Sequence, residues 1–395
     1  MAELHRLGIL VLNQIAASGL ARLPAERFEV GKAVAEPAAI LVRSADLHKT
    51  QIPASVRAIA RAGAGTNNIP VAAMSARGVP VFNAPGANAN AVKELVLAGM
   101  LMAAREIGPA LRFSAGLDAR APDLEHQVEA GKKAFAGFEI AGKDLGIIGL
   151  GKVGSLVADA AIKLGMNAIG FDPEITVDAA WSLPSQVRRA TSVDDVLRNA
   201  HFVTLHVPLL AATRHLVNAG NLALMRPGAV LLNFAREGVV DDAAVVQALD
   251  SGRLGHYVCD FPGPALQGHP RVIALPHLGA STREAEENCA VMVVEQLRDF
   301  LDHGNVVNAV NFPNVAMPRE SAWRVAIANS NVPNMLGQIS TAMAQAGLNI
   351  HNMVNKSRGE MAYTLVDVDS APPPAVLAAI AAIDGVLSVR DLPAP

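Results

Sequence analysis

The chain has 395 residues, which is long for one ordinary hydrophobic core and indicates two or three domains. Apolar residues make up 51% and charged residues 17%, a composition that excludes a disordered or fibrous protein. The net charge of -3 provides no basic field for nucleic acid or anionic lipid, and the apolar run at 95–104 is shorter than the roughly 20 residues of a membrane span. We therefore expect a cytoplasmic, globular protein that acts on small molecules, with no nucleic-acid or membrane partner.

The cysteines and histidines give no sign of a metal site. Cys259 and Cys289 are the two cysteines, and neither has the spacing of a disulfide framework or a ligand pair. We expect both to be buried thiols in a reducing compartment. Six histidines lie between positions 201 and 277, and none forms an HExxH or similar pair, so no metal is predicted.

Short runs rich in Val, Ile and Leu alternate with helix-length amphipathic stretches over the first 276 residues. This alternation predicts βαβ units and parallel sheets, and the units are too numerous for one sheet. We expect an α/β fold with two doubly wound, Rossmann-like lobes and a cleft between them. The predicted strands lie within 7–12, 38–44, 56–63, 79–83, 144–151, 167–172, 201–208, 228–235, 256–261 and 271–277.

Two long helices and a third sheet complete the predicted elements. Residues 88–108 have helical apolar spacing and should pass between the lobes, and 283–304 should return the chain to the first lobe and end at Gly304. Residues 309–320, with prolines and asparagines, are predicted to be a linker. From 321 to 395 the order strand, helix, strand, strand, helix, strand predicts a separate ferredoxin-like βαββαβ domain.

The motif "GLGKVG" lies between an apolar strand and a helical pattern. Gly149 would permit a tight turn, Gly151 would let the backbone approach a pyrophosphate, and Gly154 would let the helix pack on the strand. Asp172 ends the next predicted strand 18 residues after Gly154 (172 minus 154), where a carboxylate can bind the adenosine ribose and repel a 2'-phosphate. The alternative for Asp172 is a solvated turn residue. The pattern favours NAD over NADP.

Two further polar residues follow predicted strands. Arg236 comes directly after 228–235, where a guanidinium could bind a substrate carboxylate and polarise a neighbouring carbonyl; the alternative is a surface ion pair with Glu237 or Asp241. His277 follows the last predicted strand of the lobe and could exchange a proton with substrate, although an isolated histidine is more often structural.

These blocks, in this order, resemble the D-2-hydroxyacid dehydrogenases, and most closely the D-3-phosphoglycerate dehydrogenase branch that carries a C-terminal ACT regulatory domain. The resemblance covers nearly the whole chain and rests on "LGIIGLGKVG", "MRPGAVLLNFAREGVVD", "ALPHLGAST" and the long block from 59 to 101. It implies NAD-dependent oxidation of 3-phosphoglycerate to 3-phosphohydroxypyruvate, the first step of L-serine biosynthesis, in a homo-oligomer. The alternatives are another 2-hydroxyacid dehydrogenase, such as a glyoxylate or hydroxypyruvate reductase, and an NADH-sensing binding protein.

The resemblance also implies domain boundaries. The substrate-binding domain would comprise 1–89 and 283–308, and the NAD-binding domain 90–282. Residues 309–320 would be the linker, and 321–395 the ACT-like regulatory domain.

The same resemblance implies a role for each matching residue. Arg236 would hold the substrate carboxylate and carbonyl, and His277 would take the hydroxyl proton. Arg43 would bind the phosphate, unless it is simply a strand-end arginine in water. The substrate wall would comprise Arg43, Ser44, the segment 62–68 that includes Gly65, and Asn88. The cofactor-binding positions would be Gly149, Gly151, Lys152, Val153, Gly154, Asp172, Phe234, Ala235, Arg236, Asp260, His277 and Gly279.

The chain departs from the family pattern near His277. The family places a glutamate that hydrogen-bonds the catalytic histidine shortly after the strand matching 256–261, but here Asp260 is the only carboxylate between Gly252 and Thr282. Three answers stay open: Asp260 pairs with His277 and so belongs to the catalytic group, a more distant carboxylate such as Glu94 does, or His277 works without one. Since the loop is short, we favour Asp260 or no carboxylate over Glu94.

The C-terminal domain is expected to bind an effector. Asn331 and Asn349 match effector positions of ACT domains, which implies L-serine as the effector. A histidine common two residues before the first of these positions is Asn329 here, which weakens that expectation.

Overall fold

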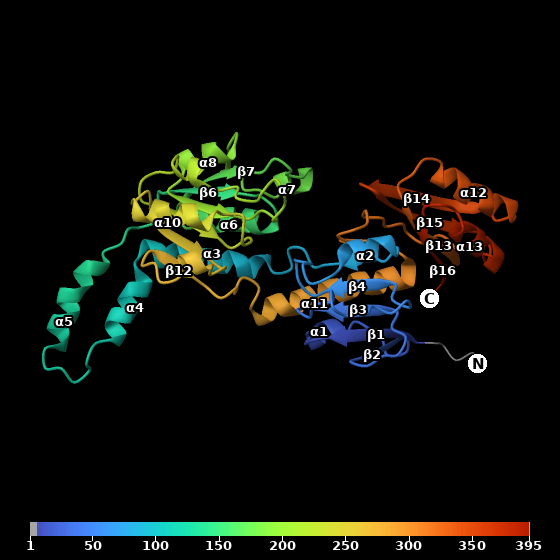
Figure 1. Ribbon diagram of the computed structural model, residues 1–395, viewed down its shortest axis with the longest axis horizontal. Coiled ribbons are helices and arrows are strands. Elements are labelled where there is room, and N and C mark those ends of the chain that lie inside the picture. Colours follow the sequence, from blue (N-terminus) through green and yellow to red (C-terminus); the bar gives the residue numbers. More distant parts are fainter. Residues whose placement is uncertain (1–5, 395) are drawn as a thin grey trace. The chain divides into compact units, whose positions relative to one another are not determined.

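The computed structural model describes residues 6–394 and divides into two compact units (Figure 1). One unit holds the chain up to Asn88 together with everything from Arg283 onward, and the other holds Ala89–Thr282. Across the described residues, every helix is too short or too polar to span a bilayer. The predicted α/β class with two parallel-sheet lobes and a C-terminal ferredoxin-like sheet is confirmed.

The unit that contains both termini has a five-stranded parallel sheet in the order β2-β1-β3-β4-β5. The strand β2 was not predicted, because as an edge strand it buries only Phe28 fully and shows no apolar run. The strands are β1 (Leu7–Leu12), β2 (Phe28–Gly31), β3 (Ala39–Val42), β4 (Ala58–Arg61) and β5 (Val81–Phe82), and the short helices are α1 (Ala17–Leu20) and α2 (Val71–Ala76).

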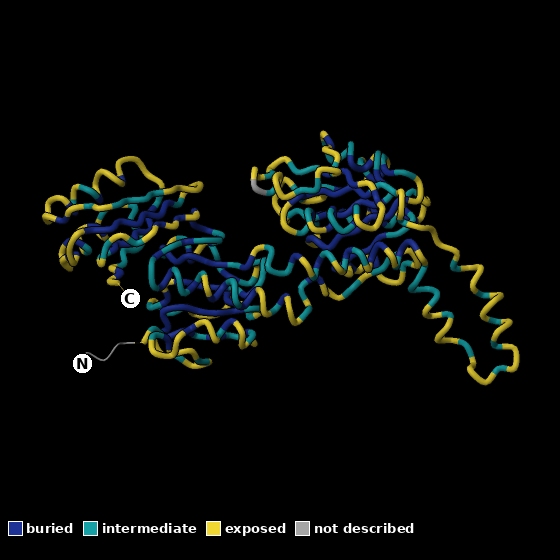
Figure 2. The backbone as a smooth tube through the Cα atoms, turned by 180° about the vertical axis from the view of Figure 1, so that it is seen from behind, coloured by how far each residue is buried: buried dark blue, intermediate teal, exposed yellow. Residues whose placement is uncertain are grey.

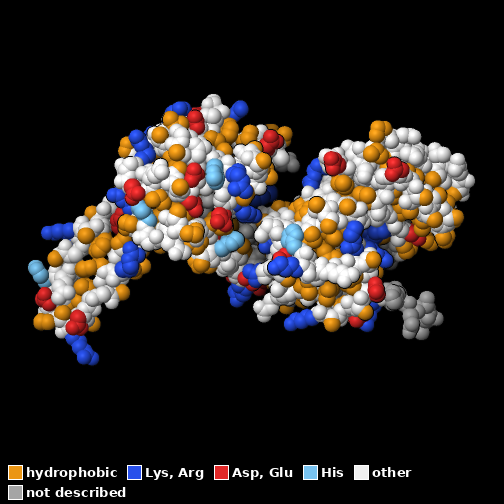
Figure 3. Space-filling model, viewed as in Figure 1, with side chains coloured by type: hydrophobic (Ala, Val, Ile, Leu, Met, Phe, Trp, Pro, Cys, Tyr) orange, Lys and Arg blue, Asp and Glu red, His pale blue; other side chains and the backbone are white. Residues whose placement is uncertain are grey.

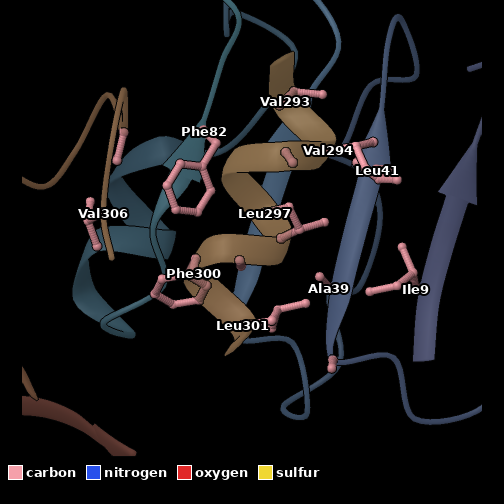
Figure 4. Packing of buried hydrophobic residues seen from close by; sticks show 14 of the residues in the cluster. Ile9, Ala39, Leu41, Phe82, Val293, Val294, Leu297, Phe300, Leu301 and Val306 are labelled. Atoms are coloured by element: carbon pink, nitrogen blue, oxygen red, sulfur yellow. The ribbon is translucent and has the colours of Figure 1, made fainter. Parts of the chain in front are cut away.

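The long helix α11 (Arg283–His303) packs its apolar face against this sheet, as Figure 4 shows. Val293, Val294 and Leu297 lie among the buried side chains of β1, β3 and β5, and the rings of Phe82 and Phe300 are 5.4 Å apart. Gly304 follows with φ +75°, the left-handed conformation that glycine adopts at a helix end, as predicted. The helix therefore ties residues after 283 to the N-terminal sheet.

The second unit is built on seven parallel strands in the order β12-β11-β10-β9-β6-β7-β8. Strands such as β9 and β10 are buried along their whole length, because apolar clusters cover both faces of the sheet, and this explains their continuous apolar runs. The strands are β6 (Asp144–Ile148), β7 (Asn167–Phe171), β8 (Arg188–Arg189), β9 (Phe202–Leu205), β10 (Ala229–Asn233), β11 (Leu254–Cys259) and β12 (Val272–Ala274).

The helices of this unit include a projecting helical hairpin that the sequence patterns did not predict. Two helices and a short 3-10 turn between α3 and β6 form a hairpin that extends from the sheet (Figures 1 and 2), and none of their side chains is buried. The helical elements are α3 (Ala89–Ala104), α4 (Ile107–Ala115), α5 (Leu124–Gly131), η1 (Lys132–Phe135), α6 (Lys152–Lys163), α7 (Val177–Trp181), α8 (Val193–Asn199), α9 (Ala219–Leu222), α10 (Asp242–Asp250) and η2 (Pro264–Leu266).

The C-terminal segment forms an antiparallel sheet in the order β14-β15-β13-β16, with two helices on one face. This is the predicted βαββαβ plan. Its elements are β13 (Trp323–Ser330), α12 (Met335–Gln345), β14 (Ile350–Arg358), β15 (Met361–Val368), α13 (Pro374–Ala381) and β16 (Val386–Pro393).

The other face of this sheet is buried with the core of the N-terminal lobe. Ala326, Tyr363 and Leu365 belong to the same apolar cluster as α11, and the Tyr363 hydroxyl donates to the Gly304 carbonyl at 2.9 Å. The segment 309–320, expected to be a linker, connects the two parts but is itself packed, since Phe312 and its apolar neighbours are buried in that cluster.

Candidate active site

The glycine motif forms the turn between β6 and α6. Gly149 has φ +94°, and a Cβ there would lie 2.6 Å from the His206 carbonyl oxygen, so only glycine fits. A Cβ on Gly154 would collide with the Gly149 carbonyl oxygen, whereas a Cβ on Gly151 would meet nothing within 4 Å. The motif thus combines a tight turn, close helix packing and an open backbone position, the features that dinucleotide binding requires.

The first turn of α6 and the end of β7 complete the cofactor features. No side chain caps the N-terminus of α6 at Gly151, so the amides of Lys152 and Val153 are available to a pyrophosphate. Asp172 lies directly after β7, and its carboxylate accepts hydrogen bonds from the amides of Leu150 (2.8 Å) and Glu174 (2.9 Å). These bonds hold Asp172 beside the glycine turn, where the residues present fit NAD.

Arg236 and His277 occupy equivalent positions after two strands of the same sheet. In the strand register Asn233 of β10, Cys259 of β11 and Ala274 of β12 are aligned. Arg236 lies three residues after Asn233, and His277 lies three residues after Ala274. Because β11 separates β10 from β12, the backbones of β10 and β12 leave the sheet roughly 10 Å apart. The side chains of Arg236 and His277 can therefore reach towards a small 2-hydroxy acid that lies between them.

The buried side chain of Asn233 shapes the loop that carries Arg236. Its amide group donates to the Arg236 carbonyl at 3.0 Å, and its Oδ1 accepts from the Ala235 amide at 3.1 Å. Asn233 was not among the predicted site residues, although an asparagine that ends the buried run "AVLLN" is a signal of such a role. Phe234 and Ala235 are buried beside it.

Arg236 and His206 are two ionisable groups with shifted pKa values at this edge of the sheet. Desolvation lowers the pKa of Arg236, but a guanidinium remains charged at neutral pH. Desolvation lowers the pKa of His206 to about 3, so this imidazole is neutral, and its Nε2 is hydrogen-bonded to Thr204 Oγ1 at 3.0 Å. His206 is therefore no proton donor near neutral pH, and His277 is the better candidate.

Asp260 does not hydrogen-bond the His277 ring. Its carboxylate is buried and accepts from the backbone amides of Leu278 and Gly279, both at 2.7 Å. Glu94 instead accepts from Asn90 at 2.8 Å. Among the described residues of this unit, no carboxylate hydrogen-bonds either ring nitrogen of His277. Of the two favoured answers, Asp260 or no carboxylate, the hydrogen bonds of this unit are in keeping with the second, because the Asp260 carboxylate binds backbone amides and not the ring.

The substrate-wall residues of the other unit lie at the carboxyl ends of β3, β4 and β5. Asn13, with φ +70°, accepts from the amides of Ser44 (3.2 Å) and Ala45 (2.6 Å), and Asn68 donates to the Ala45 carbonyl at 2.7 Å. Arg43 donates to Glu286 at 2.7 Å and stays partly exposed. Gly65 follows β4 and Asn88 follows β5 along the chain. Neither Asn13 nor Glu286 was among the predicted site residues.

Comparisons with known proteins identify the family of this chain. Residues 98–279 match the family model described as "D-isomer specific 2-hydroxyacid dehydrogenase, NAD binding domain". The chain is 34% identical over 343 residues to D-3-phosphoglycerate dehydrogenase of Haemophilus influenzae, covering 83% of this chain and 79% of that protein. It is 33% identical over 341 residues to the Escherichia coli protein of the same name, with coverage of 83% and 79%.

The chain belongs to the D-isomer-specific 2-hydroxyacid dehydrogenases. This dehydrogenase uses NAD, in keeping with the NAD-binding domain of the family. A solved NAD-bound 3-phosphoglycerate dehydrogenase of Entamoeba histolytica has the same fold, with a TM-score of 0.61, 24% identity, and coverage of 77% of this chain and 98% of that one. The D-mandelate dehydrogenase of Rhodotorula graminis also shares the fold, with a TM-score of 0.68, 23% identity, and coverage of 79% and 99%.

The C-terminal sheet of the dehydrogenase does not bring its two predicted effector residues together. Asn331 follows β13, where its side chain donates to the Gly359 carbonyl at 3.0 Å. Asn349 precedes β14, and its amide donates to Asp369 at 3.2 Å. Since Ser330 pairs with Met361 while Ile350 pairs with Val368, the two asparagines lie at opposite ends of the sheet. Asn329 is buried, and its amide group donates to the Ser330 carbonyl.

Among residues 6–394, no three His, Cys, Asp or Glu side chains gather where they could hold a metal ion.

Proposed function

We propose that this dehydrogenase oxidises 3-phosphoglycerate to 3-phosphohydroxypyruvate, the first step of L-serine biosynthesis. The main support is the similarity to proteins named D-3-phosphoglycerate dehydrogenase over about four fifths of the chain (83%). Arg43 lies on a hydrogen-bonded loop of the proposed substrate wall. Its guanidinium supplies the positive charge that a phosphate requires. We assign substrate binding to the N-terminal lobe and cofactor binding to the second unit, as the sequence resemblance implies.

In the proposed mechanism, Arg236 binds the substrate carboxylate and draws electron density from the C2 oxygen. His277 accepts the proton from the C2 hydroxyl, so that the C2–O bond becomes a carbonyl. NAD, when bound, accepts the hydride that leaves C2. Arg43 supplies the positive charge for a substrate phosphate. In the reverse direction His277 returns the proton to the carbonyl oxygen.

The test follows NADH absorbance with 3-phosphohydroxypyruvate, hydroxypyruvate, glyoxylate and pyruvate, and compares kcat/KM. We expect a strong preference for the phosphorylated acid, and Arg43→Gln should remove that preference while leaving hydroxypyruvate turnover close to wild type. Glu286→Gln is the matched variant, because it frees Arg43 from its ion pair and should lower KM for the phosphorylated acid.

A second 2-hydroxyacid substrate is favoured by one observation, the 2.7 Å ion pair between Arg43 and Glu286. If that pair persists with substrate bound, the guanidinium is neutralised and an unphosphorylated acid fits better. Equal kcat/KM for hydroxypyruvate or glyoxylate, unchanged in Arg43→Gln, would establish this alternative. Absence of turnover with every 2-keto acid would favour an NADH-binding protein without catalysis.

We further propose a homo-oligomer that uses the α4–α5 hairpin. Neither helix has a buried side chain, Leu111 is 64% exposed, and Figure 3 shows apolar side chains along the hairpin. Such a surface is typical of a face covered by another subunit. Leu111→Glu should lower the molar mass measured by light scattering, whereas Leu210→Glu, on an exposed loop, should not.

L-serine as an effector and a cytoplasmic location complete the proposal. The ferredoxin-like plan and Asn331 support an amino-acid effector, although Asn349 lies too far away to share one site with it in a single chain. Addition of L-serine should lower the rate, and an unchanged rate would rule serine out. Two buried, unpaired cysteines, Cys259 and Cys289, suit a reducing compartment.

A further inference from the structure

The backbone around His277 is held in an unusual conformation. His277 has φ +57°, which is uncommon for a residue other than glycine and requires support from its surroundings. Its amide lies 3.1 Å from the Asp260 carbonyl and 3.0 Å from the Leu275 carbonyl, and the next two amides bond the Asp260 carboxylate. Asp260 therefore fixes the Cα–Cβ direction of His277 while leaving its ring free to rotate about the side-chain bonds.

The imidazole ring is contacted by the ring of Phe261. The two centroids are 5.0 Å apart and the planes are inclined by 59°, a tilted arrangement favoured by aromatic pairs. The backbone of Phe261 is itself held, because its carbonyl accepts from the Gly263 amide at 2.9 Å and from Cys259 Sγ at 3.5 Å. One fixed loop thus presents the phenyl ring to the imidazole.

A histidine that exchanges protons with substrate needs two things from its neighbours. Its ring must be oriented, and its charged form must be stabilised after it accepts the proton; a carboxylate or carbonyl hydrogen-bonded to the other nitrogen usually does both. An aromatic ring can do the same more weakly, since its electron-rich face attracts a cation and its bulk excludes other rotamers. No hydrogen-bonding carboxylate serves the His277 ring among the described residues of its unit, but Phe261 contacts it.

We infer that Phe261 is the positioning residue of His277, an aromatic ring in the place where a carboxylate would ordinarily act. The inference rests on the proposed function, in which His277 exchanges the proton with the 2-hydroxy acid. It assigns orientation of the imidazole to Phe261 and support of the loop to Asp260. Neither residue takes the substrate proton.

The kinetic test compares Phe261→Leu, which keeps an apolar side chain but removes the ring, with Phe261→Tyr, which restores it. Phe261→Leu should lower kcat about tenfold to a hundredfold, because a misplaced base slows proton transfer. It should leave KM for the keto acid nearly unchanged and move the pH–rate profile. In Phe261→Tyr, kcat and the pH–rate profile should both be close to those of the wild type. Phe138→Leu is the matched control, since it removes a ring that contacts Phe202 away from the site.

A spectroscopic readout tests the contact without turnover. In protein labelled with 13C-histidine, the ring signals of His277, assigned by their loss in His277→Gln, should carry a ring-current shift from Phe261. Phe261→Leu should remove that shift and Phe261→Tyr should keep it. If wild type turns over no 2-keto acid, the proposed function fails, and unmoved His277 signals in Phe261→Leu would separately overturn the contact.

The kinetic outcomes also distinguish a positioning role of Phe261 from general destabilisation of the protein. A wild-type kcat and pH–rate profile in Phe261→Leu would overturn the inference even if the His277 signals move. Equal losses in Phe261→Leu and Phe138→Leu would do so as well, because they would reveal general destabilisation. A tenfold loss confined to Phe261→Leu, with rescue by tyrosine, would support it.

Discussion

Replacement of Arg324 by Met should strongly destabilise the unit that holds the N-terminal and C-terminal sheets. Arg324 and Asp367 are paired across β13 and β15, and both side chains are 0% exposed. Nε donates to Asp367 Oδ1 at 2.6 Å and one terminal nitrogen donates to Oδ2 at 2.9 Å. The remaining guanidinium donors bind the carbonyls of His303, Met317 and Pro318 at 2.9 to 3.0 Å.

The size of the effect follows from these contacts. Arg324→Met leaves the buried Asp367 carboxylate with one backbone donor, the Glu320 amide, and leaves three carbonyls without this partner. Breaking a buried pair on one side costs about 3–5 kcal/mol in the free energy of unfolding. Replacing both partners, Arg324→Met with Asp367→Leu, leaves no uncompensated charge and should cost less than either single change.

Urea unfolding followed by the fluorescence of Trp323 measures the loss of unfolding free energy in the unit that contains Arg324. The other tryptophan, Trp181, is 86% exposed and lies in the second unit, so a Trp181→Phe background leaves one reporter at little cost in stability. Single variants within about 0.5 kcal/mol of the parent, the range of ordinary surface changes, would refute the reasoning. A double variant less stable than either single one would refute it too.

Three further outcomes test the site and the core. Arg236→Lys should lower kcat/KM at least about a hundredfold in the NADH assay, because an ammonium cannot bind a carboxylate bidentately, and retention of wild-type kcat/KM would exclude a direct role. Asp172→Ala should raise the ratio of kcat/KM for NADP to that for NAD about tenfold or more, and an unchanged ratio would mean that Asp172 does not face the ribose. Burial raises the pKa of Cys259 to about 11. At pH 8 only about one thiol in a thousand is then ionised, so Cys259 should resist a thiol reagent until urea is added, and fast labelling of the native protein would contradict its burial.

The sequence by itself determined the fold class and the glycine turn proposed for the cofactor. Strands buried on both faces require continuous apolar runs, and helices require apolar spacing near 3.6, so β6, β10 and α11 were predictable from local patterns alone. The glycine spacing of 149, 151 and 154 depends only on the turn that joins a strand to a helix. The α4–α5 hairpin was not predictable, because a helical pattern does not state whether a helix packs on its own sheet or projects from it, and no side chain of either helix is buried.

Only the tertiary structure decided which partner each polar group has. Asp260 and His277 are 17 residues apart (277 minus 260), yet the carboxylate binds backbone amides rather than the ring, and Arg324 meets Asp367 across a strand pair. A residue pattern states which groups can form hydrogen bonds, but desolvation on folding selects the partners, because each buried group must be satisfied by whatever the packed chain brings within about 3 Å. That selection depends on strand register and loop geometry, which local sequence does not specify.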